Sequence, residues 1–96
     1  NLDPAARTIS PALRKGLEEM RAQVLAGGPL PAVLAAGRER LGSLGFEVEY
    51  LVACEEEALT EVADVDGPVP VRLFAAARLG GVRLLDNIPL SEAHHG

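Results

Sequence analysis

Apolar residues recur at helical spacing in two segments of the first half of the chain. Steps of four, three and four residues separate the apolar positions of the first segment, which are Leu13, Leu17, Met20 and Val24. This spacing lines them along one face of a helix and predicts that the face is buried. Proline favours the first turn of a helix and disfavours helical geometry in the residue before it, so Ser10-Pro11 predicts where the helix begins. Gly27-Gly28 predicts that it stops close to Ala26.

A second amphipathic pattern precedes Gly45. Its apolar line consists of Leu30, Leu34, Gly37, Leu41 and Leu44. The charged residues Arg38–Arg40 lie mostly off that line, so a second helix is predicted to end at Gly45. Upstream of both patterns, Asp3-Pro4 carries a helix-start signal and predicts a short helical turn that ends near Ile9.

From Phe46 the period of the pattern changes to two. One set of alternating positions is Phe46, Val48, Tyr50 and Val52, and the other is Glu47, Glu49, Leu51 and Ala53. Alternation of this kind predicts a strand with at least one covered face. The acidic run of residues 55–57 fits either one exposed helical turn, because carboxylates favour the positive end of a helix, or a solvated loop.

Two further β-rich segments, Val71–Leu79 and Val82–Ile88, are separated only by Gly80-Gly81. Two-residue hairpin turns need positive φ angles, which glycine adopts at little cost, so these segments predict a β-hairpin. Pro89 lacks a backbone donor and is predicted to end the strand ladder. Alanine is a weak strand former, and the small side chains of Ala75–Ala77 suggest close packing of a helix.

The order of these elements, helices first and strands last, favours an α+β fold over an alternating one. We expect two layers: a three-stranded, mostly antiparallel sheet with the two main helices on one face. Because 96 residues suffice for a single small core, residues 1–90 are predicted to form one domain and residues 91–96 a polar tail. The other face of the sheet is free for a partner.

Composition and charge narrow the classes of function. Fourteen acidic against nine basic residues give a net charge of −5, which repels phosphate backbones and anionic membranes, so neither nucleic acid nor a membrane is expected as a partner. The single cysteine cannot form an internal disulfide, and the uncharged stretches are too short to span a bilayer. A reducing, cytoplasmic location is therefore expected.

The chain offers few groups for catalysis. A phosphate loop of the form G-x-x-x-x-G-K-[ST] is absent, and Cys54 has no His or Lys near it in the sequence to activate its thiol. Cys54 is therefore interpreted as structural rather than nucleophilic. His94 and His95 are interpreted as part of the terminal tail rather than as metal ligands.

A polar group surrounds the predicted hairpin: Arg78, Arg83, Asp86 and Asn87. Arg78 and Arg83 flank the turn and can approach each other across the ladder, where a carboxylate or phosphate would bind. Arg83 and Asp86 point to opposite faces of a strand. The simpler interpretation is solvated arginines and an Asp-Asn pair that bonds nearby backbone at the strand end. We predict structural or interdomain roles for these four residues, and no catalytic, substrate-binding or metal-binding residue in the chain.

The segment Phe74–Leu90, FAAARLGGVRLLDNIPL, resembles the closing signature of pantothenate synthetases (pantoate–beta-alanine ligases). In that signature an alanine pair and a small-residue turn precede Arg-Leu-Ile/Leu-Asp-Asn. Asn1–Arg7 and Gly45–Leu51 are similar to two other segments of the family, in the right order, so the resemblance spans nearly the whole chain. The chain departs from the family pattern at Asn1, Cys54, Glu55 and Val82. None of these positions is catalytic in the family.

The resemblance implies the carboxy-terminal part of an enzyme that joins pantoate to β-alanine. The family uses ATP and magnesium, forms a pantoyl-adenylate and releases AMP and pyrophosphate. Its His-x-Gly-His and Ser-Ser-Arg-Asn motifs belong to the preceding, N-terminal nucleotide-binding domain, which this chain lacks, so no catalytic residue carries over. The implied role is a lid over that domain, in an enzyme that is a homodimer. The chain alone is expected to be inactive and to bind neither ATP nor magnesium.

Two other classes of function compete with this one. A stand-alone, non-catalytic binding or dimerisation module would use the open sheet face or an edge strand and would equally lack catalytic groups. A small metal- or thiol-dependent enzyme would require Cys54 to converge with His94 or His95.

Overall fold

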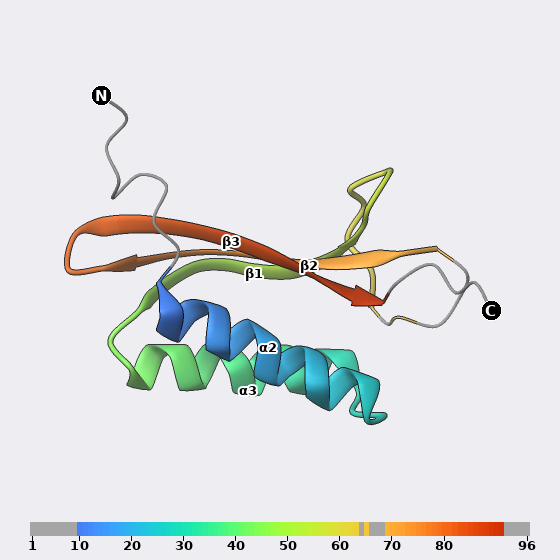
Figure 1. The fold of residues 1–96 in the computed structure, drawn as a ribbon, viewed down its shortest axis with the longest axis horizontal. Helices are drawn as coiled ribbons and strands as arrows, with labels where there is room; N and C mark the ends of the chain where they lie inside the picture. Colours follow the sequence, from blue (N-terminus) through green and yellow to red (C-terminus); the bar gives the residue numbers. More distant parts are fainter. Residues whose placement is uncertain (1–9, 64, 66–68, 92–96) are drawn as a thin grey trace.

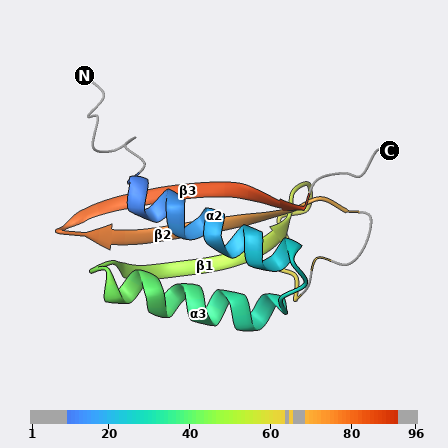
Figure 2. The same ribbon diagram turned by 60° about the horizontal axis from the view of Figure 1, so that its bottom comes forward.

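Two helices and three strands follow one another in the computed structural model, which describes residues 10–63, 65 and 69–91. The elements are α2 (Pro11–Leu25), α3 (Leu30–Ser43), β1 (Glu47–Glu55), β2 (Val71–Leu79) and β3 (Val82–Ser91). The strands form one antiparallel sheet in the order β1-β2-β3, and both helices cover the same face of it (Figure 1). Figure 2 shows α2 lying along β3 and α3 along β1. The predicted two-layer α+β fold is confirmed.

Both helices end in the same hydrogen-bonded motif, in which a left-handed glycine reverses the chain. At the end of α2, Gly27 has a φ of 102°, and the Gly28 N–H donates to the Gln23 carbonyl at 2.8 Å. At the end of α3, Gly45 has a φ of 101°, and the Phe46 N–H donates to the carbonyl of Leu41 at 3.0 Å. This arrangement satisfies carbonyls that the last turn leaves without helical partners. The left-handed glycine explains why each helix ends close to the predicted position.

The start of α2 is also as predicted. The Ser10 hydroxyl accepts from the Leu13 N–H at 3.4 Å, and Pro11 occupies the first helical turn. The short turn predicted to end near Ile9 lies outside the described residues. In α3 one predicted core position is wrong: Leu44 is exposed, because the helix ends at Ser43 and Leu44 is its C-cap.

Strand β1 is confirmed, but its alternation is interrupted. The register with β2 shifts between Val48 and Tyr50, so Glu49 is the extra residue of a β-bulge. Before the bulge Val48 packs against the core, and after it Leu51 and Ala53 do so, whereas Tyr50 is exposed. The bulge thus exchanges the two faces of the strand partway along it.

The hairpin between β2 and β3 has the predicted turn. Gly80 and Gly81 both have positive φ angles, 59° and 86°, as the favoured two-residue turn requires. The prediction that Pro89 ends the ladder is wrong, because β3 continues to Ser91 and Pro89 pairs with Arg72. A proline is tolerated there because β3 is an edge strand and its register shifts at this point. The rest of the predicted tail, residues 92–96, lies outside the described residues.

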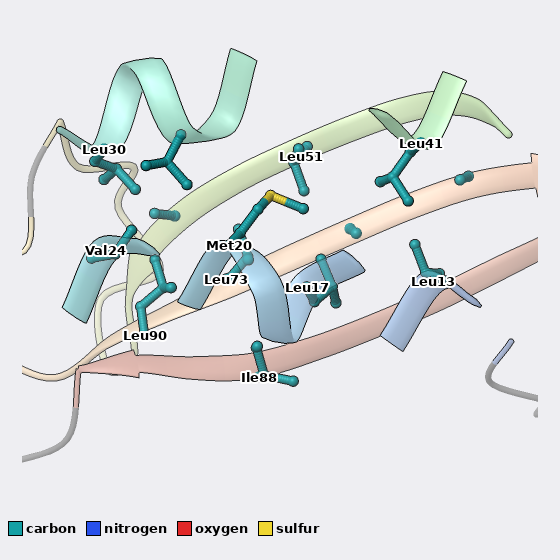
Figure 3. Close-up of a cluster of buried hydrophobic side chains, with 14 of the residues drawn as sticks. Leu13, Leu17, Met20, Val24, Leu30, Leu41, Leu51, Leu73, Ile88 and Leu90 are labelled. Carbon is teal, nitrogen blue, oxygen red and sulfur yellow. The ribbon is translucent and has the colours of Figure 1, made fainter. Parts of the chain in front are cut away.

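The core lies between the sheet and the two helices, as Figure 3 shows for ten labelled side chains. Its largest fully buried side chains are Leu13, Leu17, Leu41, Leu73 and Leu90. Each such leucine contributes about 1.5–3 kcal/mol through burial. Ala75 and Ala77 are also buried against the helices, whereas Ala76 lies on the opposite face. The core therefore lies on one face of the sheet only.

Candidate functional site

The face of the sheet that the helices leave uncovered, called the outer face here, has an apolar centre. It consists of Tyr50, Val52, Phe74, Ala76 and Leu85. Tyr50 and Leu85 flank Ala76 across the three strands and are 39% and 50% exposed. Val52 and Phe74 are neighbours in the next row and are half-buried. These side chains cannot belong to the core, because they alternate with residues that do.

At the hairpin end of the outer face, two arginines share one carboxylate. Arg78 and Arg83 are direct partners in the ladder. The bulge residue Glu49 accepts from Arg83 Nε at 2.7 Å and from Arg78 Nε at 2.8 Å. The hydrogen bond from Arg83, followed by that from Arg78, lowers the pKa of Glu49, and Glu49 in turn raises the pKa of Arg83. The position between the two arginines, where the sequence suggested a carboxylate or phosphate, is occupied by the carboxylate of Glu49.

At the opposite end of the outer face, Arg72 joins two further residues. Its Nε donates to Glu56 Oε2 at 3.1 Å, and its terminal nitrogen donates to Asn87 Oδ1 at 2.7 Å. The Asn87 side chain therefore binds a residue of the neighbouring strand rather than nearby backbone. The apolar centre has a charged group at each end.

Asp86 lies on the other face of the sheet from Arg83, as the spacing predicted, and its side chain is 2% exposed. Its carboxylate accepts from Arg14 Nε at 2.9 Å and from the terminal Nη2 of Arg14 at 2.8 Å, a two-pronged pair between α2 and β3. Asp86 also accepts from the Asn87 backbone N–H at 2.7 Å. The pair raises the pKa of Arg14, mainly through the hydrogen bond. Sequence reasoning missed Arg14, because 72 residues separate it from Asp86 and no local pattern links them.

Cys54 is buried at the far end of β1, where a neighbouring segment covers the strand edge. The Val62 N–H donates to the Ala53 carbonyl at 2.9 Å, and Glu61 forms a bridge with Cys54. Burial, with a smaller contribution from Glu61, raises the pKa of the thiol. A protonated, covered thiol is a poor nucleophile. His94 and His95, the proposed partners of Cys54 in a small enzyme, lie outside the described residues.

Glu55 is the last residue of β1, and the rest of the acidic run forms an exposed turn. The Leu59 N–H donates to the Glu55 carbonyl at 2.8 Å, which closes a single turn. Leu59 has a φ of 57° and is 63% exposed. A left-handed conformation is costly for a leucine, so this exposed apolar side chain is held in a strained position.

Three features of the described residues concern metal ions, phosphate groups and membranes. Within residues 10–63, 65 and 69–91, no three His, Cys, Asp or Glu side chains gather into a group that could hold a metal ion. The described glycine pairs lie between two helices and in a hairpin, not between a strand and the helix that follows it. None of the described helices is long and apolar enough to cross a membrane.

Comparison with known proteins agrees with the resemblance seen in the sequence. The family model of Pantoate-beta-alanine ligase matches residues 1–89. The chain is 44% identical over 87 residues to the pantothenate synthetase of Acidiphilium cryptum (strain JF-5), covering 91% of this chain and 31% of that protein. It is 38% identical over 88 residues to that of Rhodopseudomonas palustris (strain BisA53), covering 91% and 30%.

A solved structure gives the same result. The crystal structure of pantothenate synthetase from Thermus thermophilus superimposes with a TM-score of 0.70 at 28% identity, covering 95% of this chain and 35% of that one. The chain thus spans about a third of the length of the relatives that it matches. The match over residues 1–89, together with the shared fold, shows that this chain belongs to the pantoate–beta-alanine ligase family.

Proposed function

We propose that the chain is the carboxy-terminal part of a pantothenate synthetase that condenses pantoate with β-alanine through a pantoyl-adenylate. The observation that carries this proposal is the family match over residues 1–89, combined with coverage of only about 30% of each relative. ATP would supply the activating adenylyl group, and magnesium would accompany it. We place both in the part of the relatives that lies outside the region matched by this chain, since no metal-binding cluster occurs among its described residues.

The role proposed for the chain is that of a lid. An acyl-adenylate is lost to hydrolysis when water reaches it, so a domain that closes over the site protects the intermediate and helps to align the incoming amine. Such a domain needs a firm shape and a contact surface more than reactive groups. A single core with an exposed, apolar sheet face supports this role.

The test is a hybrid enzyme, made by replacing the aligned region of the Acidiphilium cryptum synthetase with this chain. The hybrid should form pantothenate from pantoate, β-alanine and ATP, whereas the same synthetase without its aligned region should not. The isolated chain should show no activity and no micromolar binding of ATP with magnesium by calorimetry. A hybrid that folds but forms no pantothenate would contradict the proposal. If the isolated chain then proved to be a stable dimer by sedimentation, a non-catalytic dimerisation module would be the better explanation.

A further inference from the structure

We propose that the outer face of the sheet is the surface that contacts the rest of the synthetase, while the helical layer faces solvent. This inference rests on the proposed function, since it takes the chain to be one part of a longer enzyme. Beyond the proposed function, it identifies the surface of this chain that makes the contact and the chemistry expected of the opposing surface.

Exposed apolar side chains gather at the centre of the outer face. Among the described residues, eight large hydrophobic side chains are exposed, and only Leu25 and Leu44, both at helix ends, belong to the helical layer. Of the other six, Tyr50 and Leu85 lie on the outer face, Leu59 and Val69 lie in the segment between β1 and β2, and Leu79 and Val82 lie at the hairpin end on the helix-facing side of the sheet. Tyr50 and Leu85 lie side by side across Ala76, with Val52 and Phe74 adjacent to them. Scattered apolar residues are normal on a surface, but a contiguous group marks a contact site.

The arrangement of charged side chains on the outer face also favours a contact surface. The centre of the outer face carries no charged side chain, and ion pairs within the chain lie at both of its ends. Glu49 joins two arginines at the hairpin end, and Glu56 pairs with Arg72 at the other. An uncharged centre with a polar rim is the usual anatomy of a protein interface. The receiving surface should therefore be apolar at its centre and polar at both ends, without an excess of either charge.

The size of the outer face favours contact with the rest of the synthetase over contact with a second copy of this chain. Strands β1 and β2 are nine residues long. Three such strands, about 4.8 Å apart and rising about 3.4 Å per residue, present roughly 400 Å². A stable dimer of independent chains usually needs about 800 Å² from each partner. Contacts between domains of one polypeptide bury about 600–1,500 Å² in total, which roughly 400 Å² per side satisfies. The face is thus suited to the remaining two-thirds of the synthetase rather than to a second copy.

A further feature lies at the edge of the same face. The turn that follows β1 rises on the side of the sheet away from the helices (Figure 1). It presents Leu59, which is exposed and in a left-handed conformation. Strain of this kind persists where surrounding structure or function maintains it. Leu59 is therefore placed to extend the apolar contact beyond the strands.

The experiment compares the accessibility of two introduced thiols. Leu85→Cys places a thiol on the outer face, and Ala35→Cys places one on the exposed side of α3 as the matched control. Each is labelled with a maleimide in the isolated chain and in the hybrid enzyme, and the labelling of the parent protein, whose Cys54 is buried, is subtracted. We expect the hybrid to slow labelling of Leu85→Cys at least about tenfold and to leave Ala35→Cys unchanged, because a covered thiol reacts only when the contact opens.

The outcomes separate this inference from the proposed function. Protection at Ala35→Cys instead of Leu85→Cys, or at neither position, overturns the inference even if the hybrid forms pantothenate. Protection at Leu85→Cys in a hybrid that forms none leaves the inference standing and contradicts the proposed function. If the hybrid does not fold, the two thiols are placed at the aligned positions of the Acidiphilium cryptum enzyme, where the same pattern supports the inference and the reverse pattern overturns it.

Discussion

Removing the carboxylate of Asp86 should destabilise the isolated chain far more than removing a charge from the outer face. Asp86→Ala deletes both hydrogen bonds from Arg14, at 2.8 and 2.9 Å, and the one from the Asn87 N–H at 2.7 Å. It also leaves a gap where a side chain only 2% exposed stood. These interactions join α2 to β3, so their loss weakens the contact between the two layers.

The magnitude follows from the exposure of the partner that is left behind. Breaking a buried ion pair costs about 3–5 kcal/mol when the remaining charge stays buried. The Arg14 side chain is 38% exposed, so water can solvate its guanidinium after the change. We therefore expect Asp86→Ala to lower the free energy of unfolding by about 2 kcal/mol. A domain of this size is stabilised by about 5–14 kcal/mol in total, so the loss is easily measured.

The assay is urea unfolding of the isolated chain, with Arg83→Ala as the matched control. Arg83 belongs to an exposed pair, and its removal should leave the free energy of unfolding nearly unchanged. Arg14→Ala should cost more than Asp86→Ala, because it leaves the buried carboxylate without a cation. The double variant should cost less than the sum of the two single changes. Equal effects of Asp86→Ala and Arg83→Ala, or simple additivity of Arg14→Ala and Asp86→Ala, would refute this reasoning.

Three further predictions concern single side chains. Because its two arginines lower the pKa of Glu49, the stability that this group contributes is present at neutral pH and is lost as the pH falls through that lowered value. Carbon-detected NMR titration should show the pKa of Glu49 rising in Arg83→Ala, and an unchanged value would contradict the pairing. Burial and the raised pKa of Cys54 predict that at pH 8 Ellman's reagent reacts at least about tenfold more slowly with the folded chain than with the chain in urea. Similar rates would show that the thiol is accessible. Leu59→Gly removes left-handed strain but adds freedom to the unfolded chain, so unfolding free energy should stay the same or rise by up to about 1 kcal/mol. A loss of stability in urea unfolding would mean that the Leu59 side chain makes a stabilising native contact.

The elements that the sequence predicted well are those that local physical chemistry determines. The two helix ends depend on glycine at a left-handed position a few residues after the last helical turn. The hairpin depends on two adjacent residues that tolerate positive φ. The spacing of apolar residues placed the buried face of α2 correctly, since helical periodicity is a property of neighbouring positions. Each of these signals lies close in the sequence to the structure that it predicts.

The candidate site could be predicted only in part. The sequence placed Arg78 and Arg83 near each other, because a hairpin fixes which residues face across it. It did not predict that Glu49 joins them, because the bulge that aims Glu49 at the arginines depends on pairing between strands far apart in the sequence. The same bulge places Tyr50 on the outer face.

The amino-acid sequence by itself determined the type and order of the described elements, the hairpin and the resemblance to pantothenate synthetases. These are set by backbone propensities and by patterns that recur over short stretches of chain. Only the tertiary structure decided that Asp86 joins α2 through Arg14, and which apolar residues remain exposed on the outer face. Those outcomes depend on the register of strands and the packing of layers, where a shift of one residue exchanges the two faces of a strand.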